Sequence, residues 1–434
     1  MGTKTACVVG FFLAVGCGGG GSSQDAGPDA VSDGGDGGSL CTAFLAASVD
    51  AGISGTCAVK SDGTLQWWGI NTRGAIGDGT TDGELCIGVS DKCRLKPVPS
   101  MITNVAQVSV GDSYTCARKM DGTLWCFGNN GYGELGNGTI TGPQCNGFCR
   151  PTPVQVTAVG TVLSVSAAQS HACAVKTDGT VWCWGVNGQG ELGDGTLTGQ
   201  TCGGLFCKPT PVQVVNLTSV ADVASGYVHS CARKIDGTVW CWGDNNDGQL
   251  GDGTSGSPDH PTPVQASIAN VAEVVVNDGA TCARKTDGTL WCWGNNQDGQ
   301  LGDGTTTGSP TPVQVASLGT KVAQITLGTG FGCALETDGT VWCWGRTGQG
   351  QLGRGVTMGS QCGGLCEPSP MQVMGLTDAA QVSAGSDFAC ARKKSGEIFC
   401  WGNRGYGALG EGTYRAKIPC ASSFCEPAPV PVCQ

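Results

Sequence analysis

Short alternating runs of apolar and polar residues recur from residue 40 to the end of the chain, and turn-forming residues separate them. In one copy, residues 108–110 alternate, residues 115–119 suit a strand, and residues 124–127 are rich in aliphatic and aromatic side chains. Met120-Asp121-Gly122 lies between the last two runs, and a three-residue loop with a left-handed glycine is a favoured hairpin connection. The pattern therefore predicts short antiparallel strands joined by tight turns.

This unit occurs seven times. Each copy contains Trp-Cys-Trp-Gly or a close variant, and its glycine stands at Gly69, Gly128, Gly185, Gly243, Gly294, Gly345 and Gly402. Most copies carry Asp-Gly-Thr before this phrase, and Leu-Gly-Asp-Gly-Thr and Pro-Thr-Pro-Val-Gln-Val after it. In Trp182-Cys183-Trp184 the two indoles share one strand face and the cysteine lies on the other. Each sheet would present aromatic residues to one neighbour and cystine to the next, so seven sheets around an axis predict an all-β propeller.

Ten-residue spacing predicts a disulfide inside each hairpin. The turn sets Lys119 opposite Thr123 and therefore Cys116 opposite Cys126. As a non-hydrogen-bonded pair, their Cα atoms would lie about 4.5 Å apart, which a disulfide tolerates. The same spacing recurs in Cys173 and Cys183, Cys231 and Cys241, Cys282 and Cys292, Cys333 and Cys343, and Cys390 and Cys400. The first copy departs from this pattern, because Trp67 stands opposite Cys57.

A second set of cysteines lies in the longer loops of five copies. The pairs are Cys86 and Cys93, Cys145 and Cys149, Cys202 and Cys207, Cys362 and Cys366, and Cys420 and Cys425. The fourth and fifth copies are the shortest and lack them, so each bridge is expected to tighten an extended loop. Cys41 and Cys433 fall at the same place in the unit, which predicts a disulfide that closes the ring. Cys57 would then be a buried thiol, whereas a Cys41–Cys57 bridge is the alternative.

Residues 1–17 resemble a secretory segment. Lys4 precedes a short apolar run, and Ala14-Val15-Gly16-Cys17 resembles a bacterial lipobox in which Cys17 is lipidated. An ordinary cleaved signal peptide is the alternative. Residues 18–39 are rich in Gly, Ser and Asp, as in a flexible acidic tether. We therefore expect an exported lipoprotein of the outer membrane or cell surface, held to the membrane by its lipid anchor only, with a periplasmic or secreted protein as the alternative.

Charge and cysteine content exclude several functions. The 434 residues carry 24 Lys and Arg against 35 Asp and Glu. Nucleic-acid binders neutralise phosphates with Lys and Arg, so we expect no nucleic-acid partner. The 27 cysteines indicate an oxidising compartment. No histidine or second cysteine pair converges at metal-ligand spacing, so we expect neither a metal nor a cofactor.

Residues 171–185, followed by Gly190-Glu191-Leu192-Gly193, closely resemble the regulator-of-chromosome-condensation repeat. The resemblance covers residues 40–434 and implies a seven-bladed β-propeller of antiparallel four-stranded blades. The eukaryotic founder of that family binds chromatin and is a guanine-nucleotide exchange factor for a small GTPase. Bacterial members include a secreted inhibitor of β-lactamases. An exported, disulfide-rich chain could not reach a cytosolic GTPase, so exchange activity is disfavoured.

Departures from the repeat are the better candidates for binding. The loops between paired cysteines carry Phe148, Leu205, Phe206, Leu365 and Phe424, which would be either binding anchors or plugs over their own blades. Tyr132 and Tyr406 are weaker candidates. His171 and His229 are expected to bond to nearby backbone, and no catalytic triad or activated cysteine can be argued.

We therefore expect a monomeric binding module, not an enzyme, whose partner is a protein or surface polymer. A secreted enzyme inhibitor is one alternative. A polysaccharide hydrolase or lyase is another, and it would need convergent carboxylates in the centre of the ring.

Overall fold

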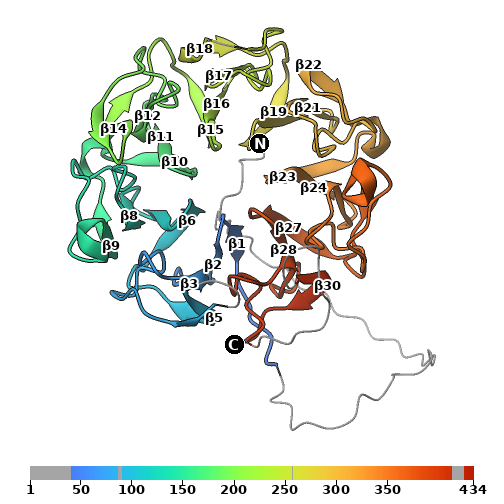
Figure 1. Cartoon of the computed structure of the whole chain (residues 1–434), viewed down its shortest axis with the longest axis horizontal. Coiled ribbons are helices and arrows are strands. Elements are labelled where there is room, and N and C mark those ends of the chain that lie inside the picture. The colour runs from blue at the N-terminus through green and yellow to red at the C-terminus, as the bar shows by residue number, and fades with distance from the viewer. Residues whose placement is uncertain (1–40, 87–89, 257, 413–424) are drawn as a thin grey trace, which may run out of the picture.

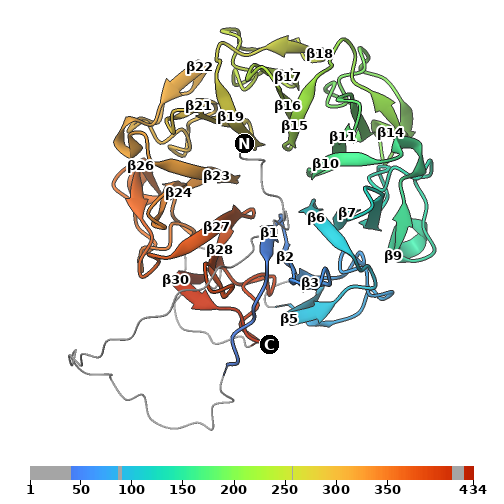
Figure 2. The same cartoon turned by 180° about the vertical axis from the view of Figure 1, so that it is seen from behind.

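The computed structural model describes residues 41–86, 90–256, 258–412 and 425–434, and it confirms the all-β, seven-bladed propeller (Figure 1, Figure 2). In each blade the chain runs from the innermost strand to the outermost. The described residues contain four single-turn 3-10 helices, which are η1 (Cys145–Gly147), η2 (Thr157–Val159), η3 (Ala316–Leu318) and η4 (Cys362–Gly364). Within these ranges, no helix is long and apolar enough to cross a membrane.

The strands of each blade are given from the centre of the ring outward. Blade 1 has β1 (Ser48–Ala51), β2 (Gly55–Val59), β3 (Leu65–Ile70) and β5 (Lys92–Pro99); blade 2 has β6 (Val105–Val110), β7 (Tyr114–Lys119), β8 (Leu124–Asn129) and β9 (Cys149–Gln155); blade 3 has β10 (Val162–Ala167), β11 (His171–Lys176), β12 (Val181–Val186) and β14 (Leu205–Gln213). Blade 4 has β15 (Val220–Ser225), β16 (His229–Lys234), β17 (Val239–Gly243) and β18 (His260–Gln265); blade 5 has β19 (Val271–Asn277), β20 (Ala280–Lys285), β21 (Leu290–Gly294) and β22 (Ser309–Gln314). Blade 6 has β23 (Val322–Gly328), β24 (Phe331–Glu336), β25 (Val341–Arg346) and β26 (Cys366–Gln372); blade 7 has β27 (Ala379–Ala384), β28 (Phe388–Lys393), β29 (Ile398–Asn403) and β30 (Cys425–Pro431). Blades 1 and 3 gain a fifth strand, β4 (Glu84–Leu85) and β13 (Gln200–Cys202).

The hairpin between the second and third strands has the register that its turn predicts. Lys119 N donates to Thr123 O at 2.9 Å, and Gly122 adopts a φ of +81°. Asp121 Oδ1 accepts hydrogen bonds from the backbone N and the hydroxyl of Thr123, at 2.9 and 2.7 Å. The recurring Asp-Gly-Thr therefore closes the turn locally.

Disulfides follow this register in the hairpins. The paired Cα atoms lie 4.0–4.1 Å apart, as non-hydrogen-bonded neighbours should. All six predicted hairpin bridges are present, namely Cys116–Cys126, Cys173–Cys183, Cys231–Cys241, Cys282–Cys292, Cys333–Cys343 and Cys390–Cys400. Cys57 is a buried thiol opposite Trp67, so blade 1 has no hairpin bridge.

The long loops carry their own disulfides. Four of the predicted bridges are present, namely Cys86–Cys93, Cys145–Cys149, Cys202–Cys207 and Cys362–Cys366. Cys425 of the fifth predicted pair is disulfide-bonded, whereas Cys420 lies outside the described residues. The predicted lipidation site, Cys17, lies outside them as well.

In six of the seven blades, a tryptophan in the third strand ties the blade to the preceding one, whereas blade 2 has Phe127 at this position. The Trp184 indole packs into the core between blades 2 and 3, and its Nε1 donates to Glu134 O at 2.7 Å. Five equivalent bonds of 2.7–2.9 Å come from Trp68, Trp242, Trp293, Trp344 and Trp401. On the other face, Cys173 and Cys183 pack with Trp242 of blade 4. Aromatic and cystine faces therefore alternate around the ring.

Glycine and proline form a belt near the outer strands. Gly138 N donates to Pro209 O at 3.0 Å, and six of the seven junctions have such a bond to a proline carbonyl. At the junction of blades 7 and 1, Gly412 N donates to Leu95 O instead, at 3.0 Å. Gly133 lies against Pro209 with a φ of +80°, and a Cβ there would stand 2.6 Å from Pro209 Cα. The prolines also remove backbone donors from the outer strands, which protects these edges from pairing with other chains.

The two ends of the described chain meet at blade 7. All four strands of that blade come from the last repeat, so no peptide links blade 7 to blade 1. Phe44 N donates to Val432 O at 3.2 Å, and Ala46 N donates to Gly396 O at 2.9 Å. The Cys41–Cys433 disulfide, with its Cα atoms 5.2 Å apart, makes the covalent link that peptide makes at the other junctions.

Removing this ring-closing disulfide should cost more stability than removing a hairpin disulfide. The Cys41–Cys433 bridge spans 392 residues and Cys282–Cys292 spans 10, so chain entropy assigns them about 6 and about 3 kcal/mol. Chemical denaturation of Cys41→Ala/Cys433→Ala and Cys282→Ala/Cys292→Ala measures both losses. A larger loss in the hairpin variant would contradict a dominant role for ring closure.

Candidate functional site

The two faces of the ring carry different connections. The loops between second and third strands lie on one face, called the hairpin face. The turns between first and second strands lie on the other, called the loop face, together with the long connections to the outer strand. Segments between the loop disulfides, called the cystine loops, belong to these long connections. The described cystine loops are residues 86–93 apart from 87–89, 145–149, 202–207 and 362–366.

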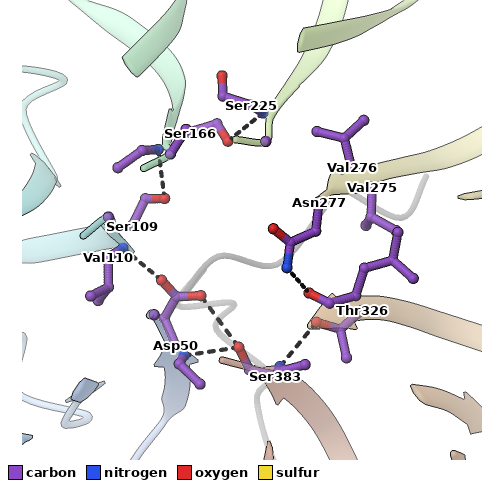
Figure 3. A pocket seen from close by; sticks show the side chains of 18 of the residues that line it. Asp50, Ser109, Val110, Ser166, Ser225, Val275, Val276, Asn277, Thr326 and Ser383 are labelled. Carbon is purple, nitrogen blue, oxygen red and sulfur yellow. Dashed lines mark hydrogen bonds between the residues drawn. The ribbon is translucent and has the colours of Figure 1, made fainter. Parts of the chain in front are cut away.

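The inner strands of all seven blades line a central cavity of about 120 Å³ (Figure 3). At five junctions a side chain on an inner strand accepts a hydrogen bond from a backbone N of the next blade. These bonds measure 2.9–3.0 Å, and the acceptors are Asp50, Ser109, Ser166, Thr326 and Ser383. The side chains of the cavity wall therefore join the blades.

Two junctions lack this bond, because Ala224 and Val275 stand where the other blades have an acceptor. Beside Val275, Asn277 Nδ2 donates instead to Leu327 O at 3.2 Å. Tyr227 Oη of blade 4 lies 2.8 Å from Thr329 Oγ1 of blade 6. The Tyr227 side chain therefore reaches past blade 5 to blade 6. Blades 4 to 6 therefore differ from the rest of the ring at the cavity.

Carboxylates of the cavity wall also serve structural contacts. Asp50 Oδ2 accepts from Val110 N at 2.9 Å, and Asp222 Oδ1 accepts from Val223 N at 3.0 Å. Glu273 pairs with Arg284 at 3.1 Å. Burial raises the pKa of Glu273 to about 7, and Arg284 opposes this shift. This arrangement offers no support for the polysaccharide-cleaving alternative. Among the described residues, no three His, Cys, Asp or Glu side chains are placed to hold a metal ion.

The apolar residues of the cystine loops are exposed. Exposed fractions are 45% for Phe148, 47% for Leu205, 45% for Phe206 and 50% for Leu365. About half of each side chain is therefore in contact with water, which favours binding anchors over plugs on the blades. Phe424 lies outside the described residues.

Tyr132 and Tyr406 are half-buried and contact the neighbouring blade. Tyr132 Cε1 approaches Gly203 in the cystine loop of blade 3, and Tyr406 packs with Leu95 beside the Cys86–Cys93 disulfide of blade 1. Both tyrosines therefore support a cystine loop.

The prediction for the histidines was wrong about their partners. His171 Nε2 and His229 Nε2 lie 2.8 Å from Ser230 Oγ and Thr281 Oγ1, hydroxyls of the next blade. The Thr281 hydroxyl donates to Gln249 O at 2.8 Å, so His229 Nε2 must be the donor. Burial lowers the pKa of both rings to about 3, which keeps them neutral.

The residue before Leu-Gly-Asp in each copy was not singled out from the sequence. Glu134 is buried, and its two oxygens accept from Asn129 Nδ2 at 2.6 Å and from Tyr132 N at 2.9 Å. Burial raises the pKa of Glu134 to about 7. Gln300 occupies the same position in blade 5, and comparison between copies could have shown that the charge is not required.

Carboxylates gather on the loop face near blades 4 to 7. Burial raises the pKa of Asp278, and the nearby carboxylates of Asp298, Asp247 and Asp387 add to this effect. Arg346 opposes it and pairs with Asp387 at 3.8 Å. These acids come from three repeats, those of blades 4, 5 and 7, so the sequence alone did not bring them together.

Two models of the regulator of chromosome condensation (RCC1) repeat match the chain. One matches residues 121–175, 178–233, 236–283, 287–335 and 338–392, which is more than half of the chain. The other matches six segments between residues 105 and 408. The chain belongs to the RCC1 repeat family.

The chain is similar in sequence to parts of two proteins with different named functions. The E3 ubiquitin-protein ligase HERC2 of Homo sapiens is 29% identical over 320 residues, which are 71% of this chain and 6% of HERC2. The ultraviolet-B receptor UVR8 of Arabidopsis thaliana is 28% identical over 311 residues, which are 70% of this chain and 66% of UVR8. The chain thus spans less than two thirds of the length of these relatives.

Two solved structures share the fold of this chain. Prp20p of Saccharomyces cerevisiae has a TM-score of 0.71 at 19% identity, with 87% of each chain covered. Human WBSCR16 has a TM-score of 0.68 at 22% identity, with 86% of this chain and 94% of that chain covered.

Replacing Glu134 by glutamine should stabilise this RCC1 propeller at high pH. The folded-state pKa of about 7 exceeds the ordinary 4.5, so the folded state binds the extra proton. The stability contribution of Glu134 therefore falls as pH rises from 4.5 to 7. Glu134→Gln should raise the unfolding free energy by about 1–3 kcal/mol at pH 8 and change it little at pH 5. Denaturant titrations at both pH values measure this, and exposed Glu84→Gln is the control. Equal effects at both pH values would contradict the assignment.

A missing bond of the central cavity can be restored. Val275→Thr supplies the hydroxyl that Thr326 has in the next RCC1 repeat and should raise the unfolding free energy by about 0.5–1.5 kcal/mol. Thr326→Val should lower it by a similar amount. Denaturation midpoints test the pair, and a destabilised Val275→Thr would show that Leu327 N does not need this acceptor.

Proposed function

We propose that this RCC1 propeller is an exported binding module that holds a partner macromolecule on its loop face. The observation that carries the proposal is the exposure of Phe148, Leu205, Phe206 and Leu365 at 45–50% on the cystine loops. Large apolar side chains that a rigid scaffold keeps in water are typical anchors of protein interfaces.

The cystine loops are held in two ways, which favours binding over flexibility. Each is closed by its own disulfide, and each rests on the preceding blade. Cys145 Sγ lies 3.4 Å from Thr72 O of blade 1, and Cys362 Sγ lies 3.5 Å from Gln297 O of blade 5. A loop that is ordered before binding loses less conformational entropy when a partner arrives.

Export is supported by the disulfides. Eleven join cysteines of the described residues, and such bonds persist in oxidising compartments. We place lipidation at Cys17 and a tether at residues 18–39, so the propeller would stand away from the outer membrane or cell surface.

One structural neighbour with the same fold binds a protein partner. Prp20, the yeast RCC1, has been solved with Kap60 bound to it. Its identity to this chain is 19%, so the likeness carries the fold and not the partner. The partner of this chain would therefore be recognised by its own loop residues.

Capture from the source cell surface tests the proposal. With the full chain as bait, Phe148→Ala/Phe206→Ala should reduce partner recovery about tenfold or more, since lost interface anchors cost at least about 1.4 kcal/mol. Met120→Thr/Ile235→Thr is the matched control, because these exposed residues lie on the hairpin face. Equal recovery by wild type and the phenylalanine variant would refute binding through these anchors.

A further inference from the structure

The repeat offers an internal reference for the surface of each blade. Val356 and Met358 stand where blade 2 has Thr139 and Thr141. Both are exposed, Val356 at 49% and Met358 at 63%. Blade 6 therefore places apolar side chains in water at positions where another copy of the same unit has threonine.

Two further departures lie on the same blade. Met371, on the outer strand β26, replaces a valine that other copies have, and Met374 stands where blade 2 has Thr157. Met374 is 57% exposed. Figure 2 shows β26 at the outer edge of the ring.

Val356, Met358 and Met374 form one surface with the tip of the cystine loop. The Met358 methyl group lies against Gly364, next to Leu365, and the Met374 methyl group lies against Gly355, next to Val356. We call this surface the blade 6 patch, and its members are Val356, Met358, Leu365 and Met374. Methionine surfaces adapt their shape to bound partners.

The fold does not require this apolar composition. In blade 3, Asp194 Oδ1 closes the equivalent loop by accepting from Thr196 N and Oγ1, at 3.2 and 2.8 Å. In blade 6, Arg354 holds the loop instead. It pairs with Glu367 at 3.4 Å and donates to Met358 O at 3.0 Å. Val356 and Met358 are thus dispensable for the loop.

Charge at the inner border of the patch indicates what would bind there. The cystine loop of blade 6 touches Gln297, and Asp298 follows it. Asp298 lies among the carboxylates of Asp247, Asp278 and Asp387, which face Arg346 as their nearby cation. A partner that covers the patch would meet negative charge on the side towards the centre of the ring.

We propose that the blade 6 patch and the neighbouring carboxylates bind a protein segment whose apolar side chains lie next to lysines or arginines. This inference rests on the proposed binding function and names the chemistry of the partner. The four side chains of the patch are too few for a stable dimer, whose interfaces use about 20–30 residues a side. They suit a short segment that inserts a few anchors.

Fluorescence anisotropy with three labelled peptides tests this proposal on the full chain. One peptide alternates lysine and leucine, the second lysine and serine, and the third glutamate and leucine. The lysine–leucine peptide should bind at least about tenfold more tightly than either of the others. Equal binding of the lysine–leucine and lysine–serine peptides, or binding of the glutamate–leucine peptide alone, would overturn the proposal.

Reversion to the residues of blade 2 supplies the decisive variant. Val356→Thr/Met358→Thr/Met374→Thr should weaken the lysine–leucine peptide about tenfold, and Asp298→Gln, the residue of blade 3, should weaken it and reduce its salt dependence. Met120→Thr/Ile235→Thr should leave binding unchanged. Unchanged binding by the reverted blade 6, or a loss of self-association on reversion, would overturn the proposal. Phe148→Ala/Phe206→Ala leaves the patch intact, so its failure in cell-surface capture remains distinct from a failure here.

Discussion

The ring depends on one contact made between neighbours, the hydrogen bond from a buried indole to a carbonyl of the preceding blade. Trp184 to Glu134 O is one of six such bonds. The carbonyl belongs to the loop that also carries Leu135 into the core beneath the indole. No blade completes its own core, because each needs the loop of its predecessor. A ring built this way must close, and the Cys41–Cys433 disulfide supplies the closure where peptide is missing.

A repeated unit separates structural residues from candidate functional ones. Asp121 and Gly122 recur in nearly every copy, and the hairpin turn explains them. Glu134 and Gln300 hold the same kind of loop, so the charge at that position is incidental to the fold. Exposed departures such as Met358 have no such local explanation. They are therefore the positions at which selection for a partner would be visible.

Features set by local geometry could be predicted from the sequence. The hairpin register follows from a three-residue turn, and the Cys116–Cys126 disulfide follows from the register. The Cys41–Cys433 bridge could be predicted because both cysteines fall at one phase of the repeat. Contacts between different copies of the repeat could not be predicted in this way. His171 pairs with a hydroxyl on the second strand of the next blade, and Tyr132 contacts the cystine loop of the next blade. These partners depend on how the blades pack together, which the sequence of one copy does not show.

In blade 1, the contact between Trp67 and Gly55 is another that the sequence did not reveal. The sequence shows Trp67 in place of a cysteine, and the structure shows its ring over Gly55. Other blades have Tyr114 or His171 at the position of Gly55. One large ring therefore replaces another across the two strands of this hairpin.

The position of the ring-closing disulfide has a topological consequence. Cys41 and Cys433 meet at the point of the unit where every other blade passes into the next through peptide. The order of contacts around the circle is then the same whichever junction the chain begins at. A circularly permuted gene, in which residues 41 and 433 are joined by peptide and a different junction between blades is opened, would therefore encode the same contacts between blades.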